Sequence, residues 1–195
     1  MYTSFWLKYI SINLLKFTFS YNILILDILL SYKFNSFNAL NFTFSNILIS
    51  VILFLLKFNL SNFFKFTFSN ILISDISFLF KYNPFNSLNF TFSNILILDI
   101  LFLLKYYPLN SLKFTFSNIL ISDILFLLKS NSFNSLKFTF SNISSNILIS
   151  DILLLLKSNS FNSLKFTFSN ILISDILLVF KSINFNFLNL LFLIY

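Results

Sequence analysis

Aspartate has the clearest potential for chemistry in this 195-residue chain, because all six acidic side chains recur at one position of a repeat. Each is followed six residues later by Lys, as in Asp123 and Lys129. On a solenoid, carboxylates in phase would form an acidic ladder, and oxygen ligands of this kind bind hard cations. Duplication of one repeat position explains the same spacing without a metal, and we favour that explanation. The six are Asp27, Asp75, Asp99, Asp123, Asp151 and Asp175, while Val51 takes the equivalent place in the second unit.

Enzymatic catalysis is not supported by the available residue types. The chain has neither His nor Cys. General acid–base catalysis usually depends on His or on a carboxylate tuned by a pocket, and a Ser nucleophile needs an imidazole partner. We therefore predict that the chain is not an enzyme, with no catalytic, cofactor-binding or metal-binding residues, no cofactor and no small-molecule substrate.

The positive net charge of the chain does not by itself indicate a nucleic-acid partner. The formal net charge of +7 results from 13 Lys and six Asp. The chain has no Arg, which is the residue that most often contacts bases and phosphates. Phe interleaved with Lys is able to stack on single-stranded nucleic acid, but Phe at a fixed phase of a repeat is more often core. We interpret the Lys as a repeated solvating charge and predict no nucleic-acid partner.

The composition is restricted in other ways. Gly is absent, so Asn is the main residue left that tolerates the left-handed turn conformation. Only 10% of the residues are charged, against about 25% in an average soluble domain. The abundant residues are encoded mainly by A- and T-rich codons, so a bias in nucleotide composition explains much of the amino-acid composition. Glycosylation sequons at Asn41, Asn59, Asn89 and Asn142 are expected by chance in such a composition.

Internal repetition dominates the organisation. The best unit, KFTFSNILISDILFLLKSNSFNSL, spans residues 113–136, and the first Phe of each unit recurs at intervals of 25, then 24 four times, then 28 residues. Tyr21 accounts for the first long step, and an insertion at 143–146 accounts for the last. We divide the chain into an N-terminal flank (1–15), one array of seven units (16–181) and a hydrophobic C-terminal flank (182–195).

Each unit predicts a short strand followed by a longer apolar segment. Residues 113–117 alternate around Phe114 and Phe116, which is typical of a strand. Ser117 and Asn118 are able to cap a helix over 119–129, although that segment is apolar on nearly every face and periodicity alone does not separate helix from strand. Residues 130–135 are polar enough for a loop. The predicted fold is an α/β repeat solenoid, with a β-solenoid or no stable fold as alternatives.

Membrane and secretory signals are weak. A spanning helix needs about 20 apolar residues, whereas each unit offers at most 114–128 with Asp123 inside it. Residues 1–16 lack the features of a signal peptide. The sequence therefore does not indicate where the protein is located, and membrane association is kept as an alternative. The segment FTFSNILIS has the composition of a cross-β segment, which predicts aggregation and self-association.

The complementary DNA strand, offset by one base, contains a recognisable motif. In that frame Asn or Lys codons yield Leu or Phe, Phe codons yield Lys or Asn, and Ser codons of the TCN type yield Asp or Glu. Reading backwards from Asn134 to Thr115, one of the products that these codons allow is LKELDLKKNKISEIKILEKV, with the choices between Lys and Asn and between Leu and Phe left open. This product resembles the leucine-rich repeat family, because it satisfies L-x-x-L-x-L-x-x-N-x-I, and the period of 24 falls within that family's range of about 20–29 residues.

The resemblance extends over all seven units, roughly residues 16–181, and it implies that the coding product is a soluble leucine-rich-repeat protein on the opposite strand. One departure is that Tyr106 followed by Tyr107 forces a stop in the offset frame. The frame as written matches the family only weakly, through Phe133, Leu136, Phe138 and Asn142.

Two functional hypotheses follow from the sequence. The first is a spurious or non-functional reading frame antisense to a leucine-rich-repeat gene, without a partner. The second is a structural or interaction repeat protein that associates with membranes, with itself or with other hydrophobic partners.

Overall fold

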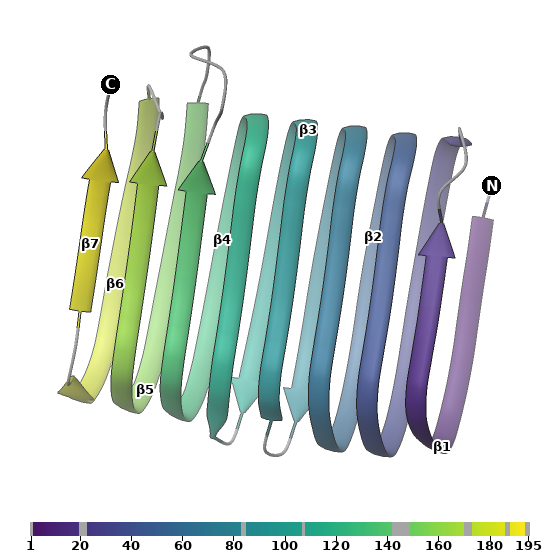
Figure 1. The fold of residues 1–195 in the computed structure, drawn as a ribbon, viewed down its shortest axis with the longest axis horizontal. Helices are drawn as coiled ribbons and strands as arrows, with labels where there is room; N and C mark the ends of the chain where they lie inside the picture. Colours follow the sequence, from purple (N-terminus) through teal and green to yellow (C-terminus); the bar gives the residue numbers. More distant parts are fainter. Residues whose placement is uncertain are drawn as a thin grey trace.

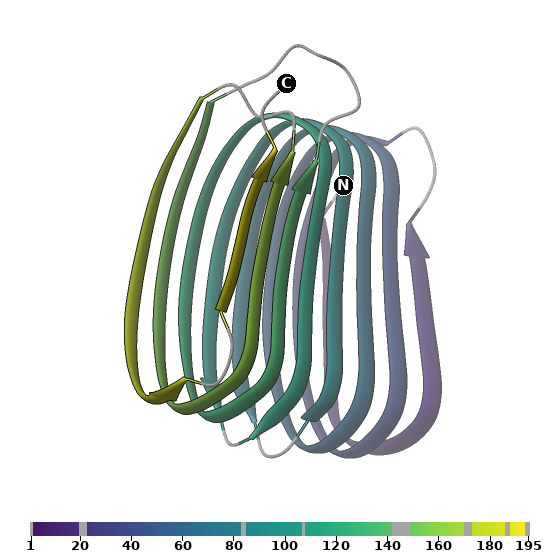
Figure 2. The same ribbon diagram turned by 60° about the vertical axis from the view of Figure 1, so that its left-hand side comes forward.

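The computed structural model describes residues 2–19, 23–82, 85–106, 108–141, 149–169, 173–185 and 188–193, and these residues form a parallel β-solenoid. The chain winds into a flattened coil with two broad faces joined by narrow corners (Figures 1 and 2). Hydrogen bonding continues around most corners, so single strands extend over more than one face. The strands are β1 (Tyr2–Phe19), β2 (Ile23–Tyr82), β3 (Phe85–Tyr106), β4 (Leu109–Ser141), β5 (Ile149–Ser169), β6 (Ile173–Phe185) and β7 (Leu188–Leu193).

Successive turns pair in parallel with identical repeat positions side by side. Phe90 pairs with Phe114, Asp99 with Asp123, and Lys105 with Lys129 across β3 and β4. The offset becomes 28 residues between β4 and β5, where Phe138 pairs with Phe166, so the extra residues lie between the end of β4 and the start of β5. β1 and β7, at the two ends of the chain, also pair in parallel with β2 and β5.

Stacked Phe side chains form the core. One ladder joins the first Phe of each KFTFS or NFTFS segment, with ring centroids 4.9–5.1 Å apart from Phe17 to Phe166. A second ladder runs through the other Phe of the same segments, from Phe19 to Phe168. Rings from the opposite face, such as Phe78 and Phe102, meet the first ladder edge to face. The expectation that the periodic Phe form core is confirmed, since the ladder rings from Phe42 and Phe44 onward are almost fully buried, while Phe17 and Phe19 in β1 are partly buried.

Asn side chains build one of the two corners. Asn46, Asn70, Asn94 and Asn118 have φ values of 53–57°, the left-handed conformation that Gly would otherwise supply. Their amides form a ladder along the solenoid axis, in which each Nδ2 donates to the Oδ1 of the preceding turn at 2.9–3.1 Å. Asn is therefore used at the place where a chain without Gly must turn sharply.

The opposite corner also depends on polar side chains. Asn110, Asn134 and Asn162 each donate an amide hydrogen bond to the Asn of the preceding turn, at 2.7–2.9 Å. Beside them, the buried Ser130 hydroxyl donates to the Ser132 carbonyl oxygen at 3.0 Å. Hydrogen bonds between equivalent side chains thus fix the register of both corners.

The prediction of an α/β solenoid is wrong in its helix, whereas a solenoid, including the β alternative, is confirmed. Residues 119–129, for which a helix was expected, belong to β4, and so do residues 130–135, for which a loop was expected. Ile124, Phe126 and Leu128 are buried, while Leu125 and Leu127 are partly exposed, which is the two-residue alternation of a strand. Asn118 turns the chain at a corner and does not cap a helix. The prediction of a strand over 113–117 is confirmed.

Candidate functional site

One broad face of the solenoid presents an ordered set of side chains to solvent. In each turn, four alternate residues point outward, and in the best unit these are Asp123, Leu125, Leu127 and Lys129. We call this surface the Leu face and define it by residues 75–81, 99–105, 123–129, 151–157 and 175–181, with 51–57 as its extension. Because turns pair in register, the four positions become four rows along the solenoid axis, named the Asp row, the first Leu row, the second Leu row and the Lys row.

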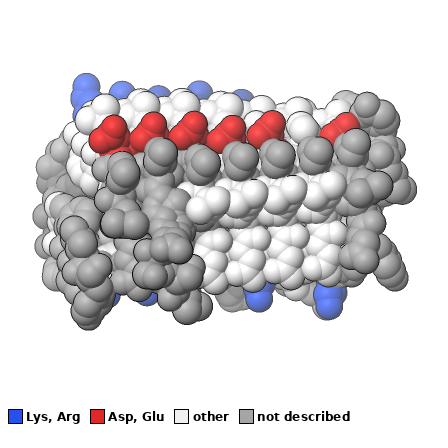
Figure 3. Space-filling view, turned by 90° about the horizontal axis from the view of Figure 1, so that it is seen from above, with Lys and Arg blue, Asp and Glu red and all other residues white. Residues whose placement is uncertain are grey.

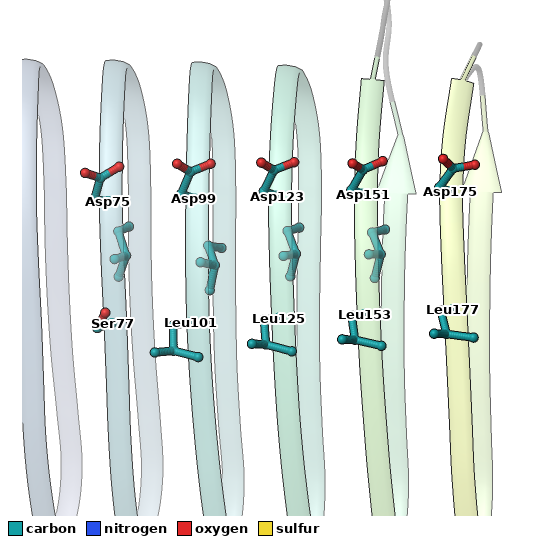
Figure 4. A pocket seen from close by; sticks show the side chains of 14 residues that line it. Asp75, Ser77, Asp99, Leu101, Asp123, Leu125, Asp151, Leu153, Asp175 and Leu177 are labelled. Carbon is teal, nitrogen blue, oxygen red and sulfur yellow. The ribbon is translucent and has the colours of Figure 1, made fainter.

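The Asp row lies at one edge of this face. Five carboxylates follow one another without interruption in successive turns (Figures 3 and 4), and all five are exposed: Asp75, Asp99, Asp123, Asp151 and Asp175. Asp27 lies beyond the turn that carries Val51 and is only partly exposed. Neighbouring strands in a sheet are about 4.8 Å apart, so the backbones of adjacent Asp are separated by that distance. The Asp positions that recur in phase in the sequence thus lie in line over five consecutive turns.

A shallow groove separates the Asp row from the first Leu row. It has a volume of about 620 Å³, and Figure 4 shows the carboxylates above it and Leu101, Leu125 and Leu153 below it. Ser77 takes the Leu position in its turn. A second groove of about 370 Å³ lies between the second Leu row and the Lys row, beside Lys81, Lys105 and Lys129. The apolar centre of the Leu face is therefore bordered on one side by the first groove and the Asp row, and on the other side by the second groove and the Lys row.

Partial burial and the neighbouring carboxylates favour the protonated form of Asp99 in the Asp row. The pKa of Asp99 is raised above its ordinary value of 3.8, first by partial burial and then by the neighbouring charges of Asp123 and Asp75. A hydrogen bond from the Asp123 backbone opposes this rise. The folded chain thus binds a proton at Asp99 more readily than the unfolded chain does.

We expect the substitution Asp99→Asn to stabilise the fold of the isolated chain at pH 7, at concentrations where no second copy supplies a counter-charge to the Asp row. A carboxyl whose folded pKa is raised binds more protons when folded, so stability falls as pH rises from 3.8 through the raised value. The gain from Asn should therefore be fully present above the raised pKa and should narrow as pH falls toward 3.8 and below. Urea unfolding of the parent and the variant between pH 3 and pH 7 measures this. Lower stability of the variant at pH 7 would contradict a repulsive Asp row.

The Lys row is too distant to neutralise the Asp row of the same chain. Asp123 and Lys129 lie six residues apart on one extended strand, a separation of about 20 Å at about 3.3 Å per residue. Lys81, Lys105, Lys129, Lys157 and Lys181 are exposed along that far edge. The Leu face therefore has one negative and one positive border with apolar side chains between them.

The opposite broad face has a different surface. Its outward residues are Ser111, Lys113, Thr115 and Ser117 in the best unit, and the same pattern recurs in the neighbouring turns with Asn in place of some Lys. We call it the Thr face. Since both faces enclose one core, the Thr face is an internal control for experiments on the Leu face.

Sequence reasoning located the Asp positions but missed the surface that they border. The signal was the spacing D-x-L-x-L-x-K, which places four residues on one side only if the segment is a strand. Among the described residues, no group of three or more His, Cys, Asp or Glu is arranged to hold a metal ion. Of the sequon residues, Asn41 and Asn89 take the position on the Thr face that Lys113 takes in the best unit. Asn59 lies in β2, and Asn142 is outside the described residues.

In the part of the chain that the structure describes, no helix has the length and hydrophobicity to cross a membrane. No family model, no curated protein and no solved structure matches the chain.

Proposed function

We propose that this chain is a structural or interaction protein, without enzymatic activity, whose Leu face binds hydrophobic partners. The observation that supports the proposal is the Leu face itself, where two rows of aliphatic side chains remain partly exposed between charged borders. At the last turn of this face in the described structure, Leu177 is 59% and Val179 44% exposed. Continuous apolar patches on a protein surface are typical of interaction sites.

The rigid periodicity of the fold also favours a structural role. Stacked Phe rings and Asn amide ladders couple every turn to its neighbours, so the spacing of surface side chains is set by the strand spacing. A partner that matches the rows over several turns would gain many weak contacts without ordering a flexible loop. Membrane association belongs to the same proposal, because an apolar face bordered by Lys also suits a lipid surface.

The first test is whether the chain forms a discrete folded species. We expect the purified chain, refolded from denaturant with and without mild detergent, to show strand circular dichroism and cooperative melting. Insoluble, thioflavin-positive material as the only product would contradict the proposal.

A triple variant then tests the Leu face. L101S/L125S/L153S copies the residue that already stands at Ser77, so we expect it to fold and to bind less of a hydrophobic fluorescent dye than the parent. The matched control is T91S/T115S/T139S on the Thr face, which should leave dye binding unchanged. Equal dye binding by the parent and the Leu-face variant would contradict the assignment of this face.

A second proposal follows from the complementary strand. We infer that, if the leucine-rich-repeat resemblance reflects the coding sequence, this chain is a non-functional reading frame on the DNA strand opposite that gene. Strand-resolved ribosome footprinting distinguishes the two proposals. Footprints on the opposite strand in the offset frame support the antisense origin, whereas footprints with the three-base period of this frame contradict it.

A further inference from the structure

We propose that the partner of the Leu face is a second copy of this chain, related by a two-fold axis parallel to the solenoid axis; this inference rests on the interaction role proposed above. A rotation of 180° about that axis reverses the strand direction of the facing copy but keeps the direction of the solenoid. The Asp row of each copy then lies opposite the Lys row of the other. Such an interface is isologous, as in most protein dimers.

Charge complementarity selects this arrangement among the two-fold pairings of the face. If the axis were parallel to the strands, Asp would lie opposite Asp and Lys opposite Lys, and like charges placed together across an interface are strongly unfavourable. With the axis along the solenoid, Asp123 of one copy faces Lys129 of the other at the same level. The two rows are about 20 Å apart within one chain, so a second copy is able to bring to each row the opposite charge that its own chain holds at a distance.

The apolar centre of the face is also self-complementary. The same rotation places the first Leu row of one copy on the second Leu row of the other. Sheets that pack face to face are about 10 Å apart and interdigitate their side chains. Rows of Leu that oppose each other at the same level would therefore pack against each other as a dry layer between the two charged borders.

The size of the face is close to the smallest that a specific dimer needs. Six successive turns, from residues 51–57 to 175–181, contribute rows. At about 4.8 Å per turn and about 20 Å between borders, the face covers about 580 Å² per copy. The total of about 1,150 Å² is near the lower limit for specific interfaces.

Charge-swap variants of the full chain test the pairing. D99K/D123K/D151K carries Lys at both borders of the central turns, and K105D/K129D/K157D carries Asp at both. We expect the parent to sediment as a dimer, each variant alone to dissociate with a dissociation constant raised at least about tenfold, and an equimolar mixture to recover a dimer. The matched control K113D/K137D/K165D places the same reversals on the Thr face and should stay dimeric.

Cysteine cross-linking tests the orientation, which is straightforward because the chain contains no Cys. A short bismaleimide should join a mixture of D123C and K129C but neither variant alone, since residue 123 faces residue 129 of the other copy. Cross-linking within D123C alone would support the strand-parallel axis and overturn the proposal.

The remaining outcomes are distinct from one another. A parent that sediments as a folded monomer, or that floats with phosphatidylcholine vesicles as a monomer, would overturn the dimer and leave the interaction role intact. Larger assemblies that persist in all charge variants would indicate end-to-end association and would overturn the dimer as well. Absence of any discrete folded species would reject the interaction role and the dimer together.

Discussion

Replacing Phe90 with Ala should lower the free energy of unfolding by about 3–5 kcal/mol, the usual cost of removing a buried aromatic ring. Phe90 is 1% exposed and stacks between Phe66 and Phe114, with centroid distances of 5.0 and 4.9 Å. Phe78 and Phe102 meet the same ring edge to face from the opposite strand segments. The truncation therefore opens a cavity at the centre of the ladder and removes contacts to three turns. Denaturant unfolding followed by circular dichroism measures the loss.

Neighbouring residues give matched controls for this ladder. Thr91→Ala lies one residue away on the outward side of the same strand, and we expect a loss of less than about 1 kcal/mol. Phe90→Leu keeps an apolar side chain in the site and should lie between the two. A cost for Phe90→Ala no greater than that for Thr91→Ala would show that the Phe ladder does not form the core in solution.

Replacing Asn94 with Val should cost about 2–3 kcal/mol of unfolding free energy, by the sum of two effects. Asn94 has φ of 53°, a conformation in which a β-branched side chain is strained. Its amide also links two turns, since its Nδ2 donates to Asn70 Oδ1 at 3.0 Å and its Oδ1 accepts from Asn118 Nδ2 at 2.9 Å. Thermal and urea unfolding measure the combined loss.

Asn94→Gly separates the two contributions. Gly adopts positive φ without steric cost, so this variant loses the amide ladder but relieves the backbone. We expect it to be more stable than Asn94→Val and less stable than the parent. Equal stability of the Val and Gly variants would mean that residue 94 is not held in the left-handed region.

The two parts of each repeat unit differ in how far their secondary structure can be predicted from the sequence. Alternation around Phe114 and Phe116 was enough to predict a strand at 113–117, because polar residues mark every second position. At 119–129 nearly every position is apolar, so the same method did not choose between a helix and a strand. The wrong preference for a helix came from treating Asn118 as a cap, when its conformation of φ 53° makes it a corner.

The strand conformation of residues 119–129 is stabilised by contacts between repeat units, which no single unit contains. In the solenoid, each segment such as 123–129 pairs with its copies in the preceding and following turns, and these pairings satisfy the backbone on both sides. Identical side chains then stack, Phe on Phe and Asn on Asn, which reinforces the parallel register. An isolated 24-residue unit has none of these interactions.

The sequence by itself determined the repeat length, the absence of His and Cys, the Phe positions of the core and the phase of the six Asp. Each of these follows from composition or from spacing along the chain. Only the tertiary structure decided that Asp123, Leu125, Leu127 and Lys129 share one outward surface. The physical reason is that side-chain direction depends on the backbone period: a strand places alternate residues on one face, whereas a helix would have distributed the same four residues around its circumference.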